Sequence, residues 1–525
     1  MANKNSKHPK RPQDAPVNVH GDAAVKVHGD APVTVHGNEA LKLLADAPVK
    51  VNGEAFFRQA PDKFQALYNR LKTEEFFGIG GEEMPKGPSL KEAVEEGSCS
   101  LPKSYIDGYA VPLEGHLPHL ERQNPTDQLK PRILEAIAGA VYQHRDGPAQ
   151  NGSTPPAPLR RFLAVISNLY RSFLADEKRT GINIKLSTVL PPLATFQHDG
   201  SLGPFTLTDD DLRDLIGADA GVVSMPALYA KHPVLWAALA HEVGGHGITH
   251  ADKGLLEELA NGVPAALSGV ELPADVSRDR LSQLWFYWMD EAAADVYGIL
   301  NIGPAFVLNQ AMFLSLCSDS GRMPPKLRME SGFDPDDPMR TLDPHPTDIL
   351  RLHLAAGVID TLLCLKPEVR SSYNDLIEQL AHSLGEGNTV TIKGNISPDR
   401  DHVQMIDLSV PLELMQRAAR SIGRYIATAN LAALSGHSIQ EIETWDNRDE
   451  DQSLTVKEAL VNHGSIDLLG DDAQLLAGAT LALLKNPELY DDVTKELNKG
   501  LDFSFRRDPI WGSLQPHRAI VRYRS

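Results

Sequence analysis

The stretch Pro233-Val-Leu-Trp-Ala-Ala-Leu-Ala-His-Glu-Val-Gly-Gly-His-Gly247 predicts an apolar helix that ends in two histidines and a glutamate. A second apolar stretch, Met289-Asp-Glu-Ala-Ala-Ala-Asp-Val-Tyr-Gly298, predicts another helix, which carries three carboxylates. Two imidazoles, a carboxylate beside the first, and a further carboxylate on a later helix are the parts of a catalytic zinc site with one open position. We therefore expect these two helices to lie at the centre of the fold.

The spacing of the two histidines departs from that of a regular helix. Ligand histidines usually stand at i and i+4, whereas His241 and His246 are five apart and would be separated by roughly 140° on a regular helix. One extra residue accommodated in a π-bulge restores a common face. Gly244 and Gly245 lie where this bulge is expected, and glycine tolerates the distortion best.

A rival set of ligands needs no distortion. Glu242, His246 and His250 stand at i, i+4 and i+8 and share one helix face. We rank this set second for two reasons. Gly247 and the polar residues before His250 indicate that the helix ends there, and the set leaves a bound water without an obvious base.

Two motifs in these stretches resemble those of a known family. His241-Glu-Val-Gly-Gly-His-Gly247 resembles the HExxGHG motif of the dipeptidyl peptidase III metallopeptidases, and Asp290-Glu-Ala-Ala-Ala-Asp295 resembles that family's second motif. The resemblance implies one Zn²⁺ ion per chain, with Glu242 as general base, Asp295 as the partner of a ligand histidine, and zinc on His241, His246 and Glu291. The first motif also resembles, more weakly, the His-Glu-Ile-Gly-Thr-His motif of the tyrosine carboxypeptidases that trim tubulin tails. Both families are zincin peptidases.

The carboxylates of the second stretch support a metal site on physical grounds. They follow an almost continuously apolar run, 284–289, and burying them is costly unless they are paired or bind a cation. Glu291 and Asp295 are one turn apart and face the same way. One can therefore ligate a metal while the other accepts the outer N–H of a ligand histidine. Asp290 is expected to point elsewhere and to orient substrate or pair locally.

The segment Asp343-Pro-His-Pro-Thr-Asp-Ile-Leu-Arg-Leu352 predicts a loop that enters a helix, with Thr347 or Asp348 as its cap. It resembles the His-Pro…Arg segment that follows the third ligand in several zincin peptidases. The resemblance makes His345 a candidate donor to the oxyanion of a tetrahedral intermediate, with Arg351 as a structural or carboxylate-binding partner. A purely structural role for His345 in the capping loop is the alternative.

Three short strands are expected before the first helix. Residues 188–196 and 203–208 alternate like strands, and Asp199-Gly200 is expected to form a turn between them. Residues 221–226 predict a third strand. By its position beside the histidine helix, Val222–Met225 is expected to be an edge strand that binds extended substrate through main-chain hydrogen bonds.

The predicted fold is mainly α with a small β-sheet, an α+β protein. We expect a zincin-like catalytic core at 190–365, a helical region at 55–189 and a C-terminal helical region at 366–525. Helical apolar spacing covers 159–174, 410–434 and 472–484, and an acidic loop is expected at 447–452.

Residues 14–53 contain a repeat of period eight, in which Asp-Ala-Pro-Val-Asn-Val-His-Gly of 14–21 recurs with small changes. Each unit can bury only two valines, which is too little to offset the entropy of ordering the backbone. We therefore expect residues 1–54 to be a poorly ordered N-terminal extension. A docking module and metal capture by the repeated histidines are the alternatives.

Composition narrows the possible partners and the compartment. A net charge of −19 argues against a nucleic-acid surface. No apolar run reaches the roughly 20 residues of a membrane helix, and the N-terminus lacks the apolar segment of a secretory signal. Cys99, Cys317 and Cys364 are far apart and are expected to be mostly buried thiols in a reducing compartment. We expect a cytoplasmic protein, with export by a route without a cleaved signal as the alternative.

The sequence thus predicts a zinc metallopeptidase that acts on a peptide or protein substrate. Two alternatives stay open: a zinc-bearing, non-catalytic scaffold that docks through the repeat, and a hydrolase of a non-peptide amide. The presence of Glu242 argues against the scaffold, because a structural zinc site needs no base and usually has four protein ligands. The sequence leaves the oligomeric state and the choice between exo- and endopeptidase undetermined.

Overall fold

The structure is a computed structural model that describes residues 60–72, 101–122, 130–144, 157–174, 179, 182, 190–197, 204–274, 276–317, 325–333, 339–399 and 402–511. All of them belong to the second of the chain's two units, Asn52–Ser525. The octad repeat, Cys99 and the expected turn at Asp199-Gly200 lie outside the described residues. The predicted domain boundaries stay predictions.

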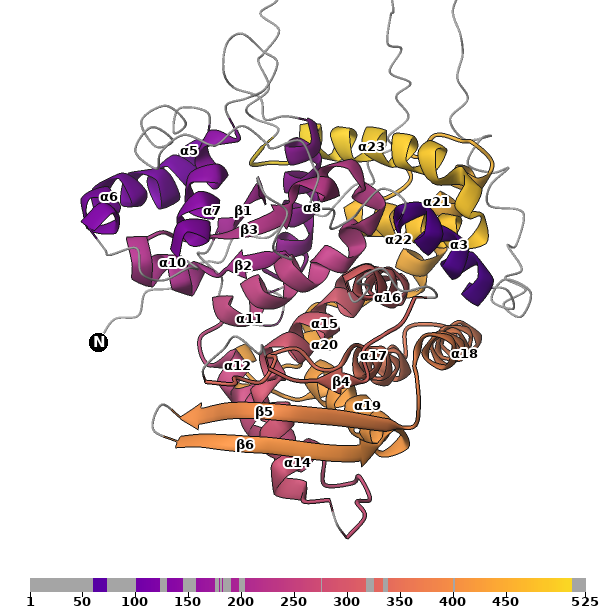
Figure 1. Cartoon of the computed structure of the whole chain (residues 1–525). Helices are drawn as coiled ribbons and strands as arrows, with labels where there is room; N and C mark the ends of the chain where they lie inside the picture. The colour runs from indigo at the N-terminus through magenta and orange to yellow at the C-terminus, as the bar shows by residue number, and fades with distance from the viewer. Residues whose placement is uncertain are drawn as a thin grey trace, which may run out of the picture. The chain divides into compact units, whose positions relative to one another are not determined.

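The described chain is mainly helical with two small sheets, which confirms the predicted α+β class (Figure 1). As far as His246, the helices are α3 (Ala60–Lys72), α5 (Lys103–Tyr105), η2 (Ile106–Ala110), α6 (Val111–Arg122), α7 (Lys130–Tyr142), α8 (Ala157–Leu174), α10 (Asp209–Ile216), η3 (Ala227–Lys231), η4 (Pro233–Leu239) and η5 (His241–His246). The helices that follow, as far as residue 361, are α11 (Gly247–Ala251), α12 (Leu255–Asn261), α13 (Val263–Ala266), α14 (Arg278–Tyr287), α15 (Met289–Ile302), α16 (Ala305–Cys317) and α17 (Asp348–Thr361). The C-terminal helices are α18 (Pro367–Leu384), α19 (Leu412–Thr428), η6 (Ala432–Leu434), α20 (Ile439–Ile442), α21 (Asn447–Val461), α22 (Asp472–Lys485), η7 (Pro487–Leu489) and α23 (Tyr490–Arg507).

The first sheet contains the three strands expected from the sequence, β1 (Leu190–Gln197), β2 (Phe205–Leu207) and β3 (Ala220–Pro226), in the order β1-β3-β2. β3 pairs in parallel with β1 and antiparallel with β2. β3 thus lies between β1 and β2. One expectation about this sheet is wrong: Val222–Met225 is not an edge strand, because β3 is paired on both sides and buried along its whole length.

On its outer side, β1 bonds to the side chain of Gln143, the residue that follows α7. The amide of Gln143 donates to the carbonyl of Phe196 at 2.7 Å and accepts from its N–H at 2.9 Å. A side-chain amide thereby takes the place of a neighbouring strand at this position. Within the described residues, β2 is therefore the edge of this sheet that faces the histidine segment, against which it packs.

The second sheet was missed by the sequence analysis, which predicted only helices after residue 366. It consists of β4 (Glu330–Ser331), β5 (Thr389–Asp399) and β6 (His402–Pro411), and β5 and β6 form an antiparallel hairpin. The signal was present, because Ile406, Leu408 and Val410 are buried and alternate with exposed residues. The helix predicted from residue 410 begins only at Leu412.

Two helices predicted from apolar spacing are present. The spacing at 159–174 corresponds to α8, and the spacing at 472–484 corresponds to α22. The acidic segment 447–452 is the first part of α21 rather than a loop. Asp446 caps this helix, and Asp449 returns a hydrogen bond to the main chain of Asp446. Acidic residues at a helix start bind free amides and favour the helix, which explains the error.

One apolar core joins the elements around the histidine segment. Helix α8 packs against β1 and α23, while η4 packs against α16 and α22. Among the described helices, none has both the length and the apolar character required to cross a membrane. Cys364 is exposed, so this thiol is not one of the mostly buried cysteines that the sequence predicts.

Candidate metal centre

The histidine segment changes helix type as it approaches the site. The 3-10 helix η4 is followed by the π-helix η5 and then by the short α-helix α11. The π-helix spans His241 to His246, which confirms the predicted distortion between the two histidines. Its wider turn brings residues five apart to a common face. The ring centroids of His241 and His246 are 5.1 Å apart.

A glycine allows η5 to lie directly against α15. A Cβ placed on Gly245 would stand 2.1 Å from both Cα and Cβ of Ala294, a distance that side chains do not adopt. The close approach matters because Ala294 lies between Glu291 and Asp295 in sequence on α15. Gly245 therefore sets the separation between the histidine helix and the carboxylate helix.

Three side chains converge between these helices. Glu291 Oε2 lies 3.0 Å from Nε2 of His241, and Glu291 Oε1 lies 3.7 Å from Nε2 of His246. Nitrogen or oxygen atoms of all three residues lie within 4.8 Å of one another, close enough to hold one metal ion. The structure thus brings together the three ligands expected from the sequence.

The outer nitrogen of His241 is anchored by a buried polar cluster. Its Nδ1 lies 2.8 Å from Oδ1 of Asp295, as the sequence predicts. Arg351 donates to both oxygens of that carboxylate, at 2.8 and 2.7 Å, and Gln310 donates to Oδ1. Arg351 is thus a structural partner of Asp295. These contacts fix the orientation of the imidazole and leave its Nε2 facing Glu291.

The outer nitrogen of His246 has its own carboxylate, which the sequence analysis did not assign to it. Asp290 Oδ1 lies 3.3 Å from Nδ1 of His246, and Asp290 Oδ2 lies 3.6 Å from Nε2 of His250. The expectation that Asp290 points elsewhere is wrong, because its carboxylate faces His246 and His250. His250 lies beside Asp290 and is not one of the three converging residues, which disfavours the rival ligand set.

The surrounding carboxylates favour positive charge at both imidazoles. Burial lowers the pKa of His246, but Glu291 and Asp290 outweigh it and raise that pKa to about 10. Burial and a neighbouring guanidinium lower the pKa of His241, yet the carboxylates of Asp295 and Glu291 leave it above its usual value. A cation at this point therefore has favourable electrostatics.

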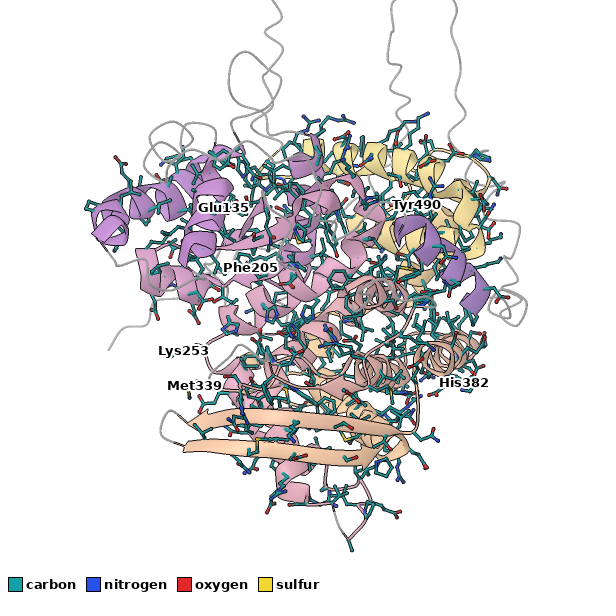
Figure 2. The ribbon with its side chains drawn as sticks, viewed as in Figure 1. Glu135, Phe205, Lys253, Met339, His382 and Tyr490 are labelled. Atoms are coloured by element: carbon teal, nitrogen blue, oxygen red, sulfur yellow. The ribbon has the colours of Figure 1, made fainter. Side chains whose placement is uncertain are left out.

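Glu242 and His345 lie at the same site. The carboxylate of Glu242 is buried and accepts a hydrogen bond from Thr206 on β2, the strand marked by Phe205 in Figure 2. The Nδ1 of His345 lies 2.7 Å from Asp343, and its Nε2 lies 3.3 Å from Oε1 of Glu291. With 42% of its side chain exposed, His345 remains accessible from outside.

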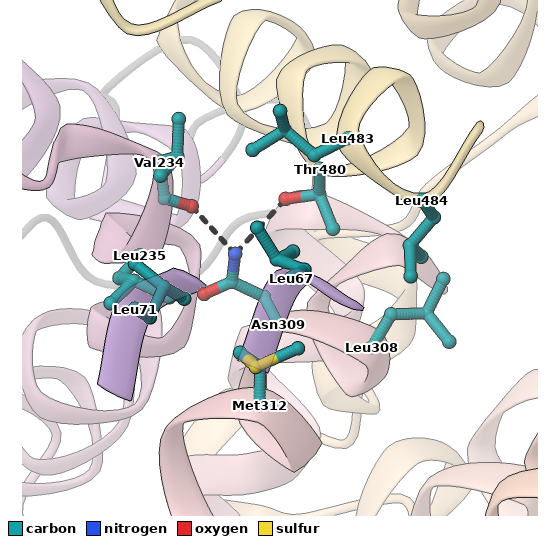
Figure 3. Close-up of a pocket in the computed structure, with 10 residues that line it drawn as sticks. All are labelled: Leu67, Leu71, Val234, Leu235, Leu308, Asn309, Met312, Thr480, Leu483 and Leu484. Atoms are coloured by element: carbon teal, nitrogen blue, oxygen red, sulfur yellow. Dashed lines mark hydrogen bonds between the residues drawn. The ribbon is translucent and has the colours of Figure 1, made fainter. Parts of the chain in front are cut away.

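The helix that leads into the site is held by Asn309, which the sequence analysis did not identify. This residue accepts from the main-chain N–H of Ala238 at 2.9 Å and donates to the carbonyl of Val234 at 2.6 Å. It also donates to Thr480 Oγ1 on α22 at 3.0 Å (Figure 3). The surrounding cavity is small and mostly apolar, and it is lined by Leu67, Leu71, Val234, Leu235, Leu308, Asn309, Met312, Thr480, Leu483 and Leu484.

Comparison with protein-family models gives no match for this chain, and neither curated proteins nor solved structures match it.

Proposed function

We propose that the chain is a zinc-dependent metallopeptidase with one Zn²⁺ ion per chain, held by His241, His246 and Glu291. The observation that carries this proposal is the convergence of these three side chains. In addition, Nδ1 of each histidine lies beside its own carboxylate, that of Asp295 for His241 and that of Asp290 for His246. Two histidines and one glutamate form a common donor set of catalytic zinc, and they leave a fourth position for water or substrate.

A buried oxygen supports the presence of a cation. Glu291 Oε2 is buried and has no partner with hydrogen-bond geometry among the described residues, although His241 Nε2 is only 3.0 Å away. An unpaired buried carboxylate oxygen is costly. A metal ion between the two residues would satisfy both, so the residues fit the group.

The residues around this position supply the remaining chemistry of peptide hydrolysis. A bound zinc ion lowers the pKa of water and polarises a carbonyl. In this proposal Glu242 would take a proton from the attacking water and pass it to the leaving amine. His345, oriented by Asp343, would donate from Nε2 to the oxygen that becomes negative.

The sheet suggests where an extended peptide would bind. β1 is closed on its outer side by Gln143, and β3 is internal, whereas Phe205–Leu207 of β2 forms an edge beside η5. An extended peptide can add to such an edge through main-chain hydrogen bonds. We therefore assign to β2 the substrate-binding role that the sequence analysis gave to Val222–Met225. The proposal includes a zincin-like core built around η5, α15 and this edge.

The proposal is tested with Glu242→Gln, which keeps the shape of the side chain and removes its basicity. We expect this variant to retain zinc and to hydrolyse a random peptide library about 10²–10⁴-fold more slowly than the wild type. Glu257→Gln, a change at an exposed glutamate of α12, is the matched control and should leave the rate unchanged. Equal rates for Glu242→Gln and the wild type would remove Glu242 from the mechanism. A wild type that holds zinc but cleaves no peptide would refute the peptidase function.

A further inference from the structure

We propose that Thr206 is a positioning residue for the general base, and that it links the edge strand β2 to the orientation of Glu242. This inference rests on the proposed function, because it deepens the role of Glu242 in that site. The two residues are far apart in sequence and come together only because β2 packs against η5.

The contact between the two residues is direct. Thr206 Oγ1 lies 2.9 Å from Oε2 of Glu242 and 3.1 Å from the main-chain oxygen of the same residue. The distance to Oε2 is within the range of good hydrogen bonds from a hydroxyl, and the distance to the main-chain oxygen is slightly longer. Thr206 therefore contacts the side chain and the main chain of Glu242 with one atom.

The carboxylate of Glu242 has little else to hold it. Over the part of the chain that the structure describes, no other side chain makes a hydrogen bond or ion pair with its oxygens. A glutamate side chain has three rotatable bonds, and an unrestrained carboxylate would occupy several orientations. The hydroxyl of Thr206 selects one of them.

The position of Thr206 is itself set by the sheet. Its main chain pairs with Val223 of β3, and its neighbours Phe205 and Leu207 pair with Ser224 and Val222. Phe205 and Leu207 also pack against the core. Because alternate side chains of a strand point to opposite faces, Thr206 is directed away from them, toward Glu242. A peptide bound along β2 would lie beside the strand that orients the base.

A hydroxyl suits this role because it serves both forms of the base. When Glu242 is ionised, Thr206 donates its hydrogen to Oε2. After Glu242 has taken a proton from water, the hydroxyl can turn its hydrogen to the main-chain oxygen and accept from the acid. No proton is gained or lost by Thr206 in either arrangement, so its part is to position Glu242.

The test compares Thr206→Val, which has the same shape without the hydroxyl, with Thr206→Ser, which restores it. We expect Thr206→Val to keep its zinc, to lose about 10–100-fold in kcat with little change in KM, and Thr206→Ser to recover most of the loss. The matched control is Thr455→Val on α21, where the hydroxyl binds only the carbonyl of Asp451. A kcat for zinc-loaded Thr206→Val equal to that of the wild type would overturn the inference.

A crystal structure of Thr206→Val separates this inference from the proposed function. We expect the carboxylate of Glu242 to leave the orientation that it has beside Thr206, while His241 and His246 stay in place. An unchanged Glu242 rotamer would overturn the inference whatever the activity. If the wild type cleaves no peptide, the proposed function fails, and the Glu242 conformation in the variant still shows whether Thr206 orients this side chain.

Discussion

The replacement Gly245→Ala tests how the fold builds the site. The added Cβ would stand 2.1 Å from Cα and Cβ of Ala294. Carbon atoms in contact lie about 3.5–4.0 Å apart, so η5 and α15 must separate by more than about 1 Å. Removing the methyl of Ala294 brings no relief, because its Cα is equally close.

Moving η5 away from α15 changes the distances between the proposed ligands, because these residues lie on the two helices. His241 and His246 are on η5, and Glu291 is on α15. Metal–ligand distances tolerate only about 0.2 Å of change, so a shift of about 1 Å removes a ligand unless the helices deform elsewhere. We expect the free energy of unfolding of Gly245→Ala to be about 1–3 kcal/mol lower than that of the wild type. We expect the variant to bind zinc at least 100-fold more weakly.

Urea unfolding and a competitive zinc titration with a chelator measure both quantities. Gly115→Ala is the matched control, because a Cβ at this helical glycine of α6 meets nothing within 4 Å. The control should be about 0.5–1 kcal/mol more stable than the wild type and bind zinc equally well. A Gly245→Ala protein with wild-type stability and zinc affinity would refute the idea that this close contact determines the ligand geometry.

Two further predictions concern residues away from the ligands. Asn309→Leu deprives η4 of two main-chain hydrogen bonds, so we expect a loss of about 2–4 kcal/mol in the free energy of unfolding; unchanged urea unfolding would contradict this. Burial raises the pKa of Asp472 from 3.8 to about 7. The unfolded chain therefore releases this proton at a lower pH than the folded chain. As pH rises from about 4 to 7, the Asp472 carboxyl lowers the free energy of unfolding by up to about 4 kcal/mol. The stability difference between Asp472→Asn and the wild type should grow over this range, and a pH-independent difference in urea unfolding would count against it.

The local geometry of the site could be predicted from the sequence. A five-residue spacing between His241 and His246 requires a distortion, and the π-helix supplies it. Glu291 and Asp295 are one helical turn apart, so their placement on one face also follows from sequence.

Features that depend on contacts between distant segments could not be predicted. Asp290 meets His246 through the packing of α15 on η5, and Thr206 meets Glu242 only through the packing of β2 on η5. The predicted edge position of Val222–Met225 was wrong for a similar reason. A short apolar run is compatible with an edge or a central strand, and pairing on both sides decides between them.

The most direct test of the central claim is the zinc content of protein purified without added metal, by elemental analysis. The wild type and Glu242→Gln should each hold one zinc ion per chain, and His246→Ala should hold none. No zinc in the wild type, even after zinc is supplied, would contradict the account. Full zinc content in His246→Ala would contradict it equally.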